Sequence, residues 1–120
     1  MKVVVTAQTN SLDSEIDPRF GRCQYLIFVD TETDSWVAVP NPALAEPGGA
    51  GIAVSQFVAD EKADALITGN IGPNAARGLA AQGIKVYVGS HGTVKEALAA
   101  LKAGQLTPAS GPTVKRRSGM

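Results

Sequence analysis

The hydrophobic positions of this chain fall into five short runs that are separated by polar or glycine-rich segments. Each run is rich in β-branched residues and too short for a typical helix, so each is predicted to be a β-strand. Four residues, Thr31 to Asp34, separate the second run from the third, and this spacing indicates a hairpin. The predicted strands are residues 2–7, 24–30, 35–40, 65–68 and 84–88.

Three other segments carry apolar residues at helical spacing. In the first, Ala50, Ala53, Val54 and Phe57 follow the i, i+3, i+4, i+7 pattern. The second begins at a proline, which is favoured at the first helical position, and is predicted to span residues 73–82. The third begins with Thr-Val-Lys-Glu at residues 93–96, which is the pattern of a capping box, and is expected to end at glycine 104.

The order of these elements predicts an α/β fold with a mixed five-stranded sheet and three helices. Right-handed crossovers make strands three, four and five parallel, and the hairpin makes strand two antiparallel to its neighbours. If strand one lies beside strand two, all the parallel strands end at the same edge of the sheet. The loops that follow these strands then gather at this edge, where open α/β sheets bind their ligands.

Glycine-rich turns precede all three predicted helices, at residues 48–51, 69–72 and 89–92. A helix that starts at such a turn presents free N–H groups and the positive end of its dipole, which favours an anion. None of the three turns matches the phosphate-binding loop of nucleoside triphosphatases. The sequence therefore predicts an anion site without predicting a nucleotide hydrolase.

Composition and charge narrow the classes of partner. Apolar residues make up 44% of the chain and charged residues 18%, as in a globular domain, and eleven basic residues balance eleven acidic ones. The chain has no excess of basic charge that would indicate binding to nucleic acid. It also has no apolar run that is long enough to cross a membrane. We expect one cytoplasmic domain over residues 1–104, followed by a flexible basic tail at residues 105–120.

One segment, Asp17-Pro18-Arg19-Phe20-Gly21-Arg22, is followed by a strand with aromatic residues and resembles the dinitrogenase iron–molybdenum cofactor biosynthesis domain family. The glycine turns at residues 48–52 and 69–73 share this resemblance, which covers residues 1–104. It implies a ribonuclease H-like three-layer fold. It also implies binding or carriage of an iron–sulfur or iron–molybdenum cluster, or its precursor, with cluster-assembly or acceptor proteins as partners.

The sequence departs from the family pattern at Arg19. Family members often have a histidine at this position, and that histidine is an attractive cluster ligand. An arginine keeps its proton and cannot coordinate a metal, but it can pair with an anion. Direct ligation of a metal at this position is therefore excluded, although an anionic cluster could still be held there electrostatically.

Two groups of candidate site residues follow. The expected metal ligands are Cys23 and His91, although a lone cysteine is more often a small buried hydrophobe and a histidine in a turn is often only solvated. The arginines could equally be surface residues beside a structural Phe-Gly turn. The expected anion or cluster site consists of Arg19, Phe20, Gly21, Arg22, Gly49, Asn70 and Gly72.

Three function classes remain open at this stage. The resemblance favours a cluster carrier, whereas the arginines and helix N-termini equally suit a binder of a small anionic metabolite or nucleotide. A metal-dependent nuclease would need carboxylates on the central strands, and strands one and four have none. We interpret Asp13, Glu15 and Asp17 as solvating charge in a loop and expect a binding domain rather than an enzyme.

Overall fold

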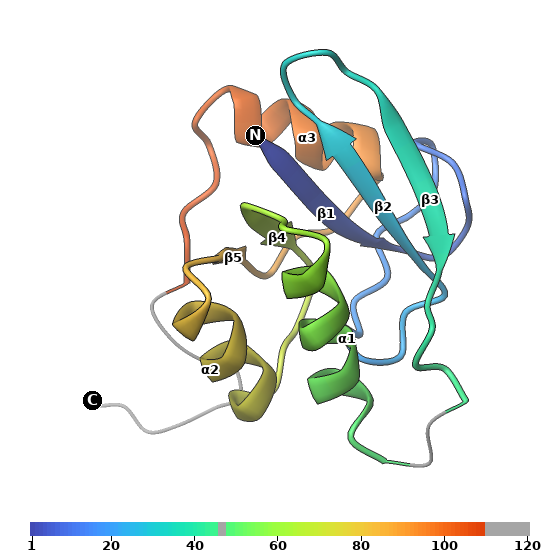
Figure 1. The fold of residues 1–120 in the computed structure, drawn as a ribbon. Coiled ribbons are helices and arrows are strands. Elements are labelled where there is room, and N and C mark those ends of the chain that lie inside the picture. The colour runs from blue at the N-terminus through green and yellow to red at the C-terminus, as the bar shows by residue number, and fades with distance from the viewer. Residues whose placement is uncertain (46–47, 110–120) are drawn as a thin grey trace.

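The structure is a computed structural model that describes residues 1–45 and 48–109. Five strands form one sheet in the order β3-β2-β1-β4-β5 (Figure 1). The strands are β1 (Lys2–Ala7), β2 (Tyr25–Asp30), β3 (Trp36–Pro40), β4 (Ala65–Ile67) and β5 (Lys85–Tyr87). The helices are α1 (Ala50–Asp60), α2 (Pro73–Ala81) and α3 (Val94–Lys102).

The pairing of the strands confirms the predicted topology. Strand β2 is antiparallel to both β1 and β3, whereas β1, β4 and β5 are parallel to one another. Helices α1 and α2 cover one face of the sheet and α3 covers the other, which gives the expected three-layer, ribonuclease H-like arrangement (Figure 1). The carboxyl ends of β1, β4 and β5 therefore share one edge.

The central strand β1 is apolar on both faces because both faces are covered. Val4 contributes to the core beneath α1 and α2, while Val3 and Val5 contribute to the core beneath α3. All three valines are fully buried, which explains why this strand reads as a continuous β-branched run rather than an alternating one.

The helix ends follow the capping signals in the sequence. The Thr93 hydroxyl accepts a hydrogen bond from the Glu96 N–H (3.1 Å), and the Glu96 carboxylate accepts one from the Thr93 N–H (2.8 Å). This is the predicted capping box of α3. Gly104 follows this helix with a φ of 72°, a left-handed conformation that favours glycine. Within the described ranges, no helix has the length and apolar character needed to cross a membrane.

The predicted tail is not separate from the domain over its first residues. The Ala109 N–H donates to the Val86 carbonyl (2.7 Å), and Leu106 packs against the core beneath α3. Residues 105–109 therefore contact the domain, and the expectation of a flexible tail from residue 105 is corrected there. The basic cluster at residues 115–117 lies outside the described residues.

Candidate anion site

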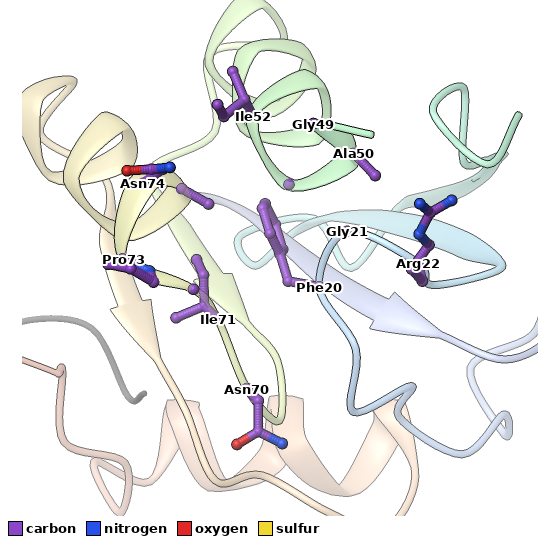
Figure 2. A pocket seen from close by; sticks show the side chains of 13 residues that line it. Phe20, Gly21, Arg22, Gly49, Ala50, Ile52, Asn70, Ile71, Pro73 and Asn74 are labelled. Atoms are coloured by element: carbon purple, nitrogen blue, oxygen red, sulfur yellow. The ribbon is translucent and has the colours of Figure 1, made fainter. Parts of the chain in front are cut away.

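A pocket of about 620 Å³ lies between the N-termini of α1 and α2 (Figure 2). Three segments that are far apart in the sequence form it: the loop after β1, the start of α1, and the turn that joins β4 to α2. The lining residues are Phe20, Gly21, Arg22, Gly49, Ala50, Gly51, Ile52, Asn70, Ile71, Gly72, Pro73, Asn74 and Ala75.

Both helices that point at this pocket begin without a side-chain cap. Their N-cap residues are Gly49 and Gly72, which have no side chain that could accept a hydrogen bond from the first turn. The first N–H groups of a helix have no intrahelical partner. In α1 these belong to residues 50–52, and in α2 to residues 74 and 75, because Pro73 has no N–H. All these residues line the pocket, so two positive helix ends meet in it.

The base of the pocket is apolar and is held in place by close backbone contacts. Phe20 and Ile71 are almost completely buried, with 3% and 2% of their surface exposed. Gly21 lies against the start of α1, so that a Cβ atom on Gly21 would lie 2.7 Å from the backbone nitrogen of Gly51. A glycine at this position therefore allows the loop after β1 to reach the helix.

Asp17 anchors the loop that carries Phe20, which corrects its interpretation as solvating charge. The residue is fully buried, and its carboxylate accepts hydrogen bonds from the Arg19 N–H (3.1 Å) and from the Arg19 guanidinium (3.1 and 3.2 Å). The hydrogen bonds and charge of Asp17 raise the pKa of Arg19. The Thr6 hydroxyl donates to the Asp17 carbonyl (2.7 Å), which ties this loop to the end of β1.

The structure brings together six of the residues predicted for the anion site. Arg19 does not line the pocket, because its guanidinium is directed to Asp17. The Arg22 guanidinium donates to the Leu44 carbonyl (3.4 Å) beside the pocket. Figure 2 shows the Asn70 side chain directed away from Phe20 and Ile71. The six lining residues are Phe20, Gly21, Arg22, Gly49, Asn70 and Gly72.

The two predicted metal ligands do not form a metal site. Cys23 is fully buried in the core beneath α1 and α2, whereas His91 is exposed, and neither lines the pocket. Over residues 1–45 and 48–109, no three histidine, cysteine, aspartate or glutamate residues are grouped so that they could hold a metal ion. Desolvation by burial raises the pKa of Cys23 to about 12, which disfavours the thiolate that a metal requires.

We expect the Cys23 thiol to resist alkylation by iodoacetamide in the native protein and to react when the protein is unfolded. The unfolded thiol ionises near its ordinary pKa of 9.0, while the native thiol stays protonated up to about 12. The native state thus binds more protons in this window, so the free energy of unfolding falls as the pH rises through it. Urea denaturation at several pH values checks this. Between pH 9.0 and about 12 the free energy of unfolding should fall less in Cys23→Ala than in the wild-type protein, because the variant has no thiol to ionise. Rapid native alkylation at neutral pH would contradict it.

Sequence reasoning missed several residues that line the pocket, among them Ile52, Ile71 and Asn74. Asn74 follows the proline that starts α2. Its position in the first helical turn could therefore have indicated that it lies at the anion site. Ile52, with 55% of its surface exposed, lies outside the apolar stripe of Ala50, Ala53, Val54 and Phe57.

Comparisons with known proteins place the chain in a family. The apo form of the orange protein from Desulfovibrio gigas has a similar structure, with 38% sequence identity, a TM-score of 0.90, and coverage of 93% of this chain and 95% of that one. A NifB-like protein from Thermotoga is 34% identical, with a TM-score of 0.77 and coverage of 98% of both chains. A dinitrogenase-like protein from Methanocaldococcus jannaschii, 19% identical over 93% of this chain and 97% of that one, shares the fold with a TM-score of 0.69.

The search of curated proteins found no match. The family model described as dinitrogenase iron-molybdenum cofactor matches residues 1–104, which is most of the chain. The chain therefore belongs to the dinitrogenase iron-molybdenum cofactor family.

Proposed function

We propose that this domain is a carrier that binds an anionic iron–sulfur or iron–molybdenum type cluster, or its precursor, in the pocket between α1 and α2. The observation that carries the proposal is the meeting of two uncapped helix N-termini in one pocket. Family membership and the apo form of the orange protein support a bound group in proteins of this kind. The volume of about 620 Å³ is in the range of small-molecule sites.

In this proposal the cluster is held by hydrogen bonds and charge rather than by metal–ligand bonds. Among the described residues that line the pocket, none carries a thiol, an imidazole or a carboxylate, whereas the N–H groups of both helices and the Arg22 guanidinium can donate hydrogen bonds. Each hydrogen bond to a charged group contributes about 1.5–3 kcal/mol, so several of them together can hold an anion without a metal–ligand bond that must break on release. Reversible binding suits a carrier that transfers its cargo to an assembly or acceptor protein.

The same donors favour a second candidate function, which is binding of a small anionic metabolite or nucleotide without a metal. Either ligand would make this a binding domain and not an enzyme, since the described lining residues contain no general acid or base.

Anaerobic reconstitution with iron and sulfide, followed by gel filtration, absorption spectroscopy and metal analysis, tests the proposal. We expect the wild-type chain and the double variant Cys23→Ala/His91→Ala to retain equal amounts of cluster. Arg22→Glu should lose it, because the substitution reverses a charge beside the pocket. Lys85→Glu makes the same charge reversal on β5 and should have no effect.

Two results would contradict the proposal in different ways. A wild-type protein that retains no iron would leave the metal-free alternative. A cluster that is lost from Cys23→Ala/His91→Ala would show direct ligation in place of electrostatic binding.

A further inference from the structure

The pocket contains few side chains that could accept a hydrogen bond from a ligand. Among the described residues that line it, only Asn70 and Asn74 have a side-chain acceptor. Figure 2 shows Asn70 directed away from the base of the pocket, so Asn74 is left as the described side chain whose orientation determines whether a ligand O–H or N–H meets an acceptor or a donor.

The carboxamide of Asn74 is oriented by a neighbour on the same helix. The Arg77 guanidinium, one turn later in α2, donates to the Asn74 side-chain oxygen at 2.6 Å. A guanidinium has no acceptor, so only the oxygen of the carboxamide can face it. The amide nitrogen must then point the other way, and Figure 2 shows it on the side that faces α1.

We propose that Arg77 is a positioning residue that makes Asn74 a hydrogen-bond donor, so that the pocket selects anions that carry no proton. The inference rests on the proposed function, because it concerns the same pocket, and it names the class of ligand: a fully deprotonated anion whose surface offers only acceptors. A ligand hydroxyl that faced this part of the lining would meet the N–H groups of Asn74 and of the helix ends, and no side-chain acceptor among the described residues.

Sulfate and phosphate are probes that separate this selection from simple attraction of charge. At about pH 8 both are dianions of similar size, but hydrogenphosphate keeps one O–H group. We expect isothermal titration to show sulfate binding about tenfold more tightly than phosphate, which is the effect of one unpaired hydrogen-bonding group.

Two variants test the role of Arg77 and Asn74. Arg77→Met frees the carboxamide to rotate and offer its oxygen, so the preference for sulfate should fall to about twofold or less. Asn74→Asp supplies an acceptor for the phosphate O–H and should also remove the preference. Lys85→Met removes one positive charge outside the pocket and should leave the preference unchanged. Thermal unfolding of each variant shows whether α2 is still folded.

The outcomes distinguish this inference from the proposed function. Equal affinity of the wild-type protein for the two anions, or a preference that survives in Arg77→Met, overturns the inference even if the cluster is retained on reconstitution. A preference for sulfate that Arg77→Met removes supports the inference even if reconstitution fails and the carrier proposal is lost.

Discussion

Replacing Gly21 with alanine is expected to lower the free energy of unfolding by about 1–3 kcal/mol, the usual cost of overpacking. The new Cβ atom would lie 2.7 Å from the nitrogen and 3.0 Å from the Cα of Gly51. These are backbone atoms at the start of α1, so the clash cannot be relieved by rotating a side chain. Either the loop after β1 or the N-terminus of α1 must move, and the pocket between them must change shape.

Gly48→Ala is the matched control, because a Cβ atom on Gly48 has no neighbour within 4 Å and its φ is not in the left-handed region. Urea denaturation should show an unchanged midpoint for Gly48→Ala and a lower one for Gly21→Ala. Equal midpoints would mean that the close approach of the loop to α1 contributes nothing to stability.

Local sequence signals were sufficient to predict the individual strands and helices, because each signal is set by neighbouring residues. The β-branched run of β1, the hairpin between β2 and β3, and the reciprocal hydrogen bonds of Thr93 and Glu96 all depend on short stretches of chain. The shared edge of the parallel strands then followed from the handedness of the crossovers. The placement of β1 beside β2 was an assumption that the structure confirms, and the three-layer arrangement was implied by the family resemblance rather than by these local signals.

The predicted site included His91, which does not line the pocket, because loops at one edge of a sheet can lie over either of its two faces. The glycine turns before α1 and α2 open on the face that these helices cover, and they form the pocket. The turn at residues 89–92 leads into α3, which packs on the opposite face. His91 consequently shares the edge with the pocket residues but does not line the pocket.

Side-chain partners were the part that the sequence could not supply. Asp17 is a charged residue in a loop and would be expected at the surface. It is nevertheless buried, because Arg19 forms an ion pair with its carboxylate and the Thr6 hydroxyl donates a hydrogen bond to its carbonyl. Asn74 and Arg77 are ordinary polar residues of an exposed helix until the structure shows that one orients the other. Such roles depend on a few ångströms of geometry that no spacing rule encodes.

Gly72→Asp is expected to stabilise the protein while abolishing retention of the cluster. Gly72 is the N-cap of α2 with φ −77° and ψ 168°, the extended conformation that N-cap residues prefer, and a side chain there would meet no atom within 4 Å. An aspartate can therefore accept a hydrogen bond from the first turn of α2 and complement its dipole. The expected gain in the free energy of unfolding is about 0.5 kcal/mol.

The same carboxylate would occupy the donors that the proposed ligand needs and would place a negative charge in its site. We expect Gly72→Asp to retain no cluster after reconstitution and to bind sulfate at least about tenfold more weakly. Gly72→Ser is the matched variant, because its hydroxyl caps the helix without a charge, and it should weaken binding less at similar stability. The two variants separate loss of the free N–H groups from repulsion of the anion. Binding of sulfate and cluster that is undiminished in Gly72→Asp would show that the uncapped start of α2 does not hold the ligand.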